Sequence, residues 1–264
     1  MDQVHVAGLR IAFQRRGAGS PLLLLHGLVC DGRLWRRELD ALSDTYTVVA
    51  WDAPGCGASS DPPGEFRIAD YGSCLAAFVD ALDLDHVHVL GHSFGSVLAL
   101  ELYRQRPSRV RSLILVGAYA GWAGSLAPAE VERRVQFALH FDPGSDDGFD
   151  PATMRGLFSD AMPGDRAAEL RQIMSEIRPA GTVTMAHALA EADLRDVLSH
   201  IDVPVLLLYG DADERSPLSV AEALHRAIGG SKLVVMPGLG HECHLESADG
   251  FEAEVRSFLT SLGT

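Results

Sequence analysis

The stretch Gly91-His92-Ser93-Phe94-Gly95 decides the fold of this chain because of what stands on either side of it. An apolar run at residues 86–90 precedes it, and a second apolar run at residues 97–100 follows it. A strand, a sharp turn and a helix form the setting in which the serine of a G-x-S-x-G sequence becomes a nucleophile. Bulky side chains at positions 91 and 95 would collide with neighbouring backbone in so tight a turn. We therefore expect Ser93 at a helix N-terminus, where free N–H groups stabilise negative charge.

Short apolar runs of β type alternate with helical stretches along the rest of the chain. Strands that are apolar throughout are buried on both faces, so the pattern predicts an α/β fold with a mostly parallel, doubly wound sheet. Residues 4–6 and 9–14 alternate more strictly and predict an antiparallel hairpin at the sheet edge. The remaining expected strands are residues 21–25, 47–51, 86–90, 110–116, 203–209 and 233–236.

Helical periodicity replaces the β-type runs between residues 121 and 196. We therefore expect an α/β core made of residues 1–120 and 197–264, with residues 121–196 inserted as a helical cap. The methionines and phenylalanines of this insertion either fix cap helices to the core or line an adaptable apolar pocket. The apolar positions at helical spacing are Val131, Val135, Ala138, Leu139, Leu170, Ile173, Met174 and Ile177.

The charge of the chain restricts its partners. A net charge of -14 argues against nucleic acid and anionic membranes, because binding to either depends on clustered Lys and Arg. No charged leader followed by an apolar run opens the sequence, and the longest apolar runs are too short to span a bilayer. We expect a cytoplasmic protein with a small-molecule substrate. The sequence does not indicate an oligomeric state.

The cysteines and the acidic residues show no metal-binding spacing. Cys30, Cys56, Cys74 and Cys243 form no C-x-x-C pair, so we expect four reduced thiols. Inert packing is the default for all four, with a place in the pocket wall as the alternative for Cys30 and Cys243. The Gly- and Asp-rich residues 142–150 lack the spacing of a calcium loop and predict a solvated connection. We expect neither a metal nor a cofactor.

A serine hydroxyl is a weak nucleophile, so it needs a base and a group that orients the base. Asp213 follows the strand expected at residues 203–209 and lies at the carboxyl edge of the sheet, so we expect it to be the orienting acid. Asp211 and Glu214 are local competitors that we expect to cap the turn or face water. The strand end Gly117-Ala118-Tyr119 carries no carboxylate.

His241 is the expected base, on a Gly-rich loop after the strand at residues 233–236. With Asp213 holding one ring nitrogen, the other can accept the proton of Ser93. His244 lies three positions away and is the alternative. We expect His92 to be structural, because its place inside the turn directs it away from the serine hydroxyl.

A tetrahedral oxyanion needs backbone donors. The N–H of Phe94, the residue after the serine, supplies one. The N–H of Leu28 is the second, in the loop His26-Gly27-Leu28-Val29 after an apolar strand. The alternative is that His26-Gly27 is only a turn.

Together these motifs resemble the α/β-hydrolase fold superfamily, in its smaller capped form, over the whole chain. The resemblance implies Ser93, Asp213 and His241 as a catalytic triad, Leu28 and Phe94 as oxyanion donors, and a cap that shapes the substrate site. The further matching positions are the His26-Gly27 loop, Asp52, Gly55, Gly57 and Ser59 of a D-x-x-G-x-G-x-S turn, Gly210, Asp213 and Pro217 of the acid loop, and Gly238, Gly240 and His241 of a G-x-G-H loop.

Three departures from particular subfamilies exclude or disfavour some of the reactions found in the superfamily. Members that attack carbon–halogen bonds or epoxides carry aspartate where this chain has Ser93. Cofactor-free haloperoxidases and perhydrolases typically carry Met where this chain has Phe94. The chain also lacks the glycine- and proline-rich oxyanion loop of proline-releasing peptidases.

We expect a serine hydrolase of the esterase or lactonase type, which cleaves a carboxylic ester or lactone through an acyl-enzyme. The two expected oxyanion donors and the serine lie in the motifs at residues 26–29 and 91–95, which we call the oxyanion and elbow motifs. Neither motif contains Arg or Lys, and the expected cap is apolar, so we expect a largely uncharged, hydrophobic substrate. Two alternatives stay open. The same triad could cleave a carbon–carbon bond of a diketone-like substrate or transfer an acyl group to an acceptor other than water. The protein could also be a hydrolase-like small-molecule receptor.

Overall fold

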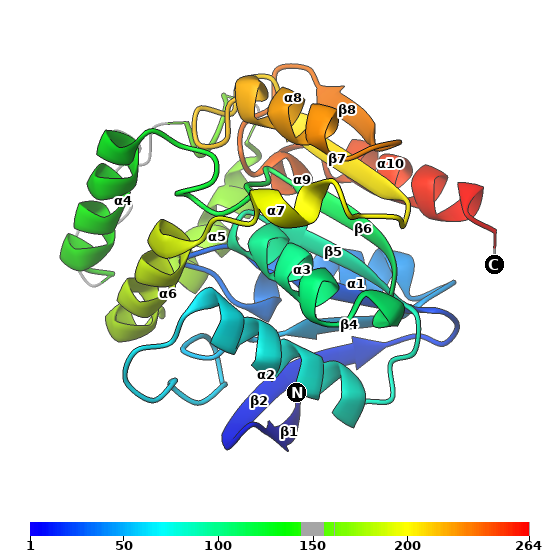
Figure 1. Cartoon of the computed structure of the whole chain (residues 1–264), viewed down its shortest axis with the longest axis horizontal. Coiled ribbons are helices and arrows are strands. Elements are labelled where there is room, and N and C mark those ends of the chain that lie inside the picture. Colours follow the sequence, from blue (N-terminus) through cyan, green and yellow to red (C-terminus); the bar gives the residue numbers. More distant parts are fainter. Residues whose placement is uncertain (144–155, 161, 264) are drawn as a thin grey trace.

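The centre of the molecule is a sheet of eight strands in the order β1-β2-β4-β3-β5-β6-β7-β8 (Figure 1). The computed structural model describes residues 1–143, 156–160 and 162–263. Strands β1 and β2 pair antiparallel at one edge, and β2 also pairs antiparallel with β4. Every other neighbouring pair is parallel. The α/β class, the mostly parallel sheet and the N-terminal edge hairpin are therefore confirmed.

The strand bounds follow the sequence pattern closely. Strands β3, β4 and β6 match the predicted segments residue for residue. Strand β5 ends two residues later than expected, because Gly91 and His92 still pair with Leu115 and Val116 of β6. The strands are β1 (Asp2–Val6), β2 (Leu9–Arg16), β3 (Pro21–Leu25), β4 (Thr47–Trp51), β5 (Val87–His92), β6 (Val110–Val116), β7 (Val205–Gly210) and β8 (Lys232–Met236).

Helices cover both faces of the sheet, which makes it doubly wound. Successive residues of β3 enter opposite layers: Leu22 and Leu24 pack in the layer of α1 and α10, and Leu23 and Leu25 pack in the layer of α2, α3 and α8. The helices are α1 (Arg36–Leu42), α2 (Ile68–Ala81), α3 (Phe94–Gln105), α4 (Pro128–His140), α5 (Gly164–Ser175), α6 (Pro179–Glu191), α7 (Arg195–Leu198), α8 (Leu218–Ala227), α9 (Cys243–Glu246) and α10 (Ala248–Ser261), with 3-10 turns η1 (Gly32–Trp35) and η2 (Pro107–Arg109).

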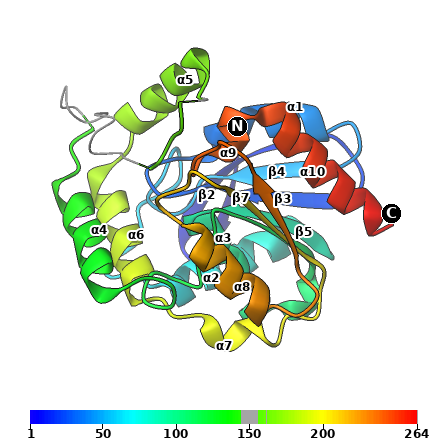
Figure 2. The same cartoon turned by 90° about the horizontal axis from the view of Figure 1, so that it is seen from above.

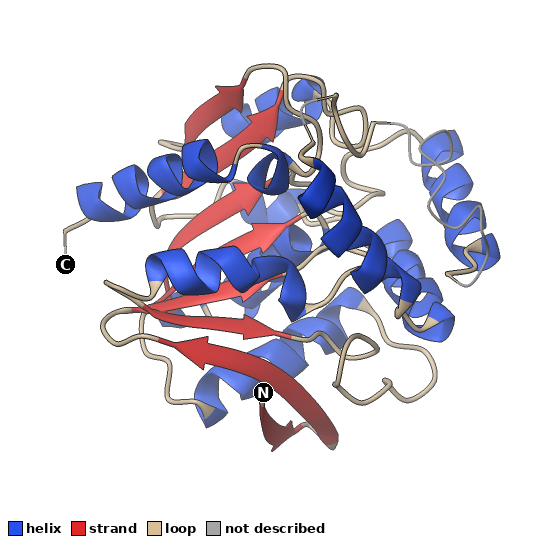
Figure 3. Cartoon of the chain, turned by 180° about the vertical axis from the view of Figure 1, so that it is seen from behind, coloured by secondary structure: helices blue, strands red, loops and turns tan. Residues whose placement is uncertain are grey.

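Helices α4, α5 and α6 come between β6 and β7 and gather at one side of the molecule (Figure 2). Seen from behind, they lie beyond the carboxyl ends of the parallel strands (Figure 3). We propose that they form the cap expected for residues 121–196. The periodicity placed Leu139 on the buried face, but this side chain is 47% exposed. The expected connection at residues 142–150 lies mostly outside the described residues.

All four cysteines are free and buried, as expected of packed thiols. Burial raises the pKa of the Cys74 thiol to about 12 and raises that of Cys30 and Cys243 further above the ordinary range. A thiol held in its protonated form is a poor nucleophile. In the described part of the chain, no helix is both long and apolar enough to cross a membrane.

Candidate active site

Ser93 lies in a strained turn between β5 and α3. Its backbone has φ 51° and ψ -111°, a region that residues other than glycine seldom occupy. Its N–H donates a hydrogen bond of 2.9 Å to the carbonyl of Val116 on β6. A Cβ on Gly91 would overlap the carbonyl of Gly95, and one on Gly95 would overlap the carbonyl of Leu25. The two glycines therefore let α3 approach the sheet closely enough to hold Ser93 in this turn.

Asp213 and His241 form a buried hydrogen-bonded pair. Nδ1 of His241 lies 2.7 Å from Oδ2 of Asp213. The other oxygen, Oδ1, accepts the N–H groups of Arg215 at 2.7 Å and Ser216 at 2.8 Å. Because a carboxylate only accepts hydrogen bonds, it keeps the proton of the neutral imidazole on Nδ1. Nε2 of His241 is then left as an acceptor for a hydroxyl proton.

The turn after β6 makes room for the imidazole. Gly117 has φ +50°, and a Cβ there would lie 2.8 Å from both Cε1 and Nδ1 of His241. The next carbonyl, that of Ala118, accepts hydrogen bonds from the Ser216 hydroxyl at 2.7 Å and from the Tyr209 hydroxyl at 2.9 Å. The segment Gly117-Ala118-Tyr119, which contains no carboxylate, thus packs against the ring of His241.

The competitors for acid and base are occupied elsewhere. Oδ1 of Asp211 accepts the N–H of Gly238 at 2.6 Å, which fits the expected turn cap, and Glu214 is exposed. The ring of His244 packs against Trp35, with 4.8 Å between ring centroids, and burial lowers its pKa to about 3. The structure therefore brings Asp213 to His241 rather than to His244.

Ser93 and His241 line one pocket, although the described structure contains no hydrogen bond between them. Such bonds often tighten only when substrate is bound. The pocket is lined by Leu28, Val29, His92, Ser93, Tyr119, Trp122, Arg134, Phe137, Leu157, Arg215, His241 and Glu242.

Within the described part of the chain, both expected oxyanion donors lack a hydrogen-bond acceptor. Among the hydrogen bonds of the described residues, none uses the N–H of Leu28 or of Phe94 as donor. The loop before Leu28 is fixed by His26, whose Nδ1 donates to the Gly27 carbonyl at 2.8 Å and whose Nε2 accepts the N–H of Ala53 at 3.0 Å. His26 is therefore a neutral structural residue, and burial lowers its pKa in agreement.

The loop of residues 26–29 also lies directly against the serine turn. A Cβ on Gly27 would lie 2.9 Å from Nδ1 of His92 and 3.5 Å from Cβ of Ser93. Nε2 of His92 donates to the carbonyl of His241 at 3.2 Å. His92 therefore connects the serine turn to the loop of the base, which agrees with its expected structural role.

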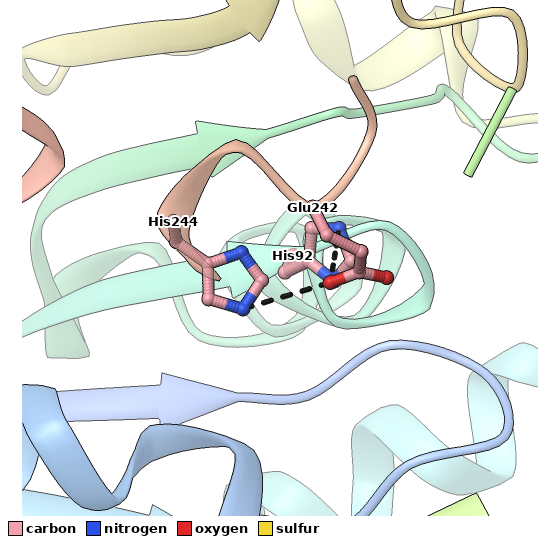
Figure 4. Close-up of side chains that lie close together, drawn as sticks. All are labelled: His92, Glu242 and His244. Carbon is pink, nitrogen blue, oxygen red and sulfur yellow. Dashed lines mark ion pairs between the residues drawn. The ribbon is translucent and has the colours of Figure 1, made fainter. Parts of the chain in front are cut away.

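His92 and Glu242, which line the pocket, form a buried cluster with His244 (Figure 4). Oε2 of Glu242 lies 3.7 Å from Nε2 of His92 and 3.6 Å from Nε2 of His244. Burial raises the pKa of Glu242 to about 8 and lowers those of both histidines, so all three are neutral at pH 7. Two histidines and a glutamate are a donor set that zinc accepts. His92 already uses its Nε2, however, and the absence of a metal stays a prediction.

Sequence reasoning missed the two arginines of the pocket. Arg215 stands two residues after Asp213, so its proximity to the site could have been inferred. Arg134 comes from α4, and only the packing of α4 against the acid loop brings it to the pocket. Nothing in its local sequence indicates that position.

Comparison with known proteins places the chain among hydrolases. A family model described as alpha/beta hydrolase fold matches residues 20–161, and one described as TAP-like protein matches residues 178–264. A pimeloyl-[acyl-carrier protein] methyl ester esterase of Neisseria meningitidis is 30% identical over 92% of this chain and 93% of its own. A 2-hydroxy-6-oxo-2,4-heptadienoate hydrolase of Pseudomonas putida is 29% identical over 98% of this chain and 95% of its own.

The chain is also similar to solved structures of hydrolases. A thermophilic esterase from Thermogutta terrifontis, determined with malate bound, superposes with a TM-score of 0.90 at 26% identity and covers 100% of both chains. The sheet order, the serine turn and these relatives agree with the resemblance drawn from the motifs. The chain belongs to the alpha/beta hydrolase fold family.

Proposed function

We propose that this protein is a serine hydrolase that cleaves a carboxylic ester or lactone through an acyl-enzyme. The observation that carries the proposal is the 2.7 Å bond between His241 Nδ1 and Asp213, in a pocket that Ser93 also lines. A strained serine, a base with a free Nε2 and two unpaired N–H groups are the parts that acyl transfer needs. The names of the relatives, which include esterases, support the same chemistry.

The first half of the reaction acylates Ser93. Its Oγ attacks the carbonyl carbon of the substrate while its proton passes to Nε2 of His241. The carbonyl electrons move to the oxygen, which the N–H groups of Leu28 and Phe94 stabilise. Asp213 stabilises the imidazolium. The C–O bond then breaks, and the leaving alkoxide takes the proton from His241.

The second half releases the acid. A water molecule gives a proton to Nε2 of His241 and attacks the acyl carbon, and the same two N–H groups stabilise the second oxyanion. The bond to Ser93 Oγ then breaks, and the oxygen takes the proton back from His241. With an ester the products are an acid and an alcohol, and with a lactone they are one hydroxy acid.

Replacement of the nucleophile tests this proposal. Ser93→Ala should lower kcat for short p-nitrophenyl esters by more than about 10³-fold, because the acyl-enzyme can no longer form. Circular dichroism should be unchanged, because Ser93 makes its hydrogen bond through the backbone. A Ser93→Ala protein that keeps wild-type turnover would refute the assignment of the nucleophile. Rapid wild-type turnover would also separate a hydrolase from the receptor alternative.

One observation favours a second candidate. The Pseudomonas putida relative is named for an oxo acid rather than an ester. The same three residues could cleave a carbon–carbon bond next to a ketone in a diketone-like substrate, with a carbanion as the leaving group. Incubation with matched esters, lactones and diketones, followed by product identification, distinguishes the two chemistries.

A further inference from the structure

Two arginines reach the pocket that contains Ser93, and neither belongs to the oxyanion or elbow motifs. Arg134 projects from α4 and is buried, with 7% of its surface exposed. Arg215 lies in the acid loop and is half-buried. The expectation of a largely uncharged substrate rested on motifs that exclude both residues. The charge of the pocket therefore depends on the contacts of each arginine.

Arg134 has partners for its charge and its donors. Its Nε lies 2.7 Å from Oε1 of Glu130, one turn earlier on α4. Its Nη1 donates to the Tyr119 hydroxyl at 3.0 Å, and its Nη2 donates to the carbonyl of Arg215 at 2.6 Å. Arg134 therefore joins α4 to the acid loop, and it shares the Glu130 carboxylate with Arg133.

Arg215 lacks such compensation. Within the described ranges, its guanidinium has no ion pair and no hydrogen bond, and it lies 5.8 Å from the centroid of the Phe137 ring. A guanidinium stays charged under all ordinary conditions. A cation in a partly desolvated pocket without a counter-ion is unfavourable. Such a group is stabilised when a ligand brings the missing negative charge.

Two carboxyl groups of the described site do not supply that charge. Both oxygens of Asp213 are engaged, one by His241 and the other by two backbone N–H groups. Glu242 lines the pocket, but burial raises its pKa to about 8, so it is mainly neutral at pH 7. In the described pocket the charge of Arg215 therefore has no counter-ion at neutral pH.

We propose that Arg215 forms a carboxylate-binding subsite, so that the preferred substrate is an ester or lactone that also carries a carboxylate. This inference rests on the proposed function and replaces the expectation of an uncharged substrate. The planar guanidinium matches a carboxylate with two parallel hydrogen bonds. Apolar side chains of the same pocket, Leu28, Val29 and Leu157, offer contacts for the chain between carboxylate and scissile bond.

A matched pair of substrates tests the subsite. Mono-p-nitrophenyl glutarate and p-nitrophenyl valerate share the leaving group and the length of the acyl chain, and differ in the terminal carboxylate. Arg215→Met should lower the ratio of their kcat/KM values, glutarate over valerate, by about 10- to 100-fold, mainly through KM. Arg226→Met is the control, because Arg226 is an exposed arginine of α8 that pairs with Glu222 and does not line the pocket, so it should leave the ratio unchanged. A ratio unchanged in Arg215→Met would overturn the proposal.

Two further measurements do not depend on the turnover of Arg215→Met, and the first of them uses only the wild type. In the wild type, glutarate should inhibit valerate ester hydrolysis at least about 10-fold more strongly than glutaramide at equal ionic strength. By calorimetry, Ser93→Ala should bind glutarate, and the double variant with Arg215→Met should not. Equal inhibition, or binding that survives Arg215→Met, refutes the subsite and leaves the serine mechanism intact. If Ser93→Ala keeps its turnover, the serine mechanism is refuted. The binding of glutarate with and without Arg215→Met then still tests the carboxylate subsite.

Discussion

At the scale of single residues, each oxygen of Asp213 has one task. Oδ2 holds the ring of His241, and Oδ1 holds the backbone of the loop that carries Arg215. The glycines have equally separate tasks: Gly91 and Gly95 allow helix and sheet to approach, and Gly117 leaves space for an imidazole. The sequence gives the identity of these residues. Their tasks depend on neighbours that are far away along the chain.

Gly117 provides a test at this scale. Gly117→Ala should lower kcat by more than about 10-fold, since the new Cβ would displace the ring of His241, and should destabilise the fold by about 1–2 kcal/mol. Gly230→Ala is a matched control, because Gly230 also has a positive φ, +74°, but nothing lies within 4 Å of its Cβ position. It should lose similar stability and keep its activity. Equal kcat for the two variants would show that Gly117 does not make room for the base.

At the scale of elements, the sequence predicted those strand bounds that depend on the apolar pattern of the segment itself. Strands β3, β4 and β6 were found to the residue because they are apolar and buried along nearly their whole length. The end of β5 was missed because Gly91 was taken as part of the turn, whereas its hydrogen bonding continues the sheet. Leu139 fits the periodicity of α4 but is exposed, because periodicity does not report how far a neighbouring element extends.

Strands β5 and β6 also share a buried polar contact that depends on pH. Nδ1 of His88 lies 2.7 Å from the hydroxyl of Ser112, and burial lowers the pKa of His88 to about 4. The pKa of His88 in the folded protein lies below its unfolded value of about 6.5. The contribution of neutral His88 to the free energy of unfolding is therefore complete above about pH 6.5 and is lost as the pH falls towards 4.

Urea unfolding at pH 7 and pH 5 measures this contribution. When the pH falls from 7 to 5, protonation of His88 should lower the unfolding free energy of the wild type by about 2 kcal/mol. His88→Gln should lose correspondingly less over the same interval. The comparison between variant and wild type removes the opposite effects of Glu38 and Glu242, whose pKa values are raised to about 8. Equal pH dependence in the two proteins would contradict a buried, neutral His88.

At the scale of the whole molecule, the parallel sheet explains why motifs far apart in sequence meet. Ser93, Asp213 and His241 each follow the carboxyl end of a parallel strand, and these ends share one edge of the sheet. This rule made the candidate site predictable. The position of Arg134 and the cluster of His92, Glu242 and His244 depend on packing between elements, so the local sequence did not reveal them.

Covalent labelling tests the central claim most directly. The protein should react with a fluorophosphonate to give one adduct per chain, which peptide mapping by mass spectrometry locates on Ser93. Among the described residues, this hydroxyl shares a pocket with His241 and lies by the N–H groups of Leu28 and Phe94, which donate no hydrogen bond there. The rate of labelling should match the rate at which ester hydrolysis is lost. The account predicts an adduct on Ser93 that is absent from Ser93→Ala. An adduct on another residue, with loss of activity at the same rate, would contradict it.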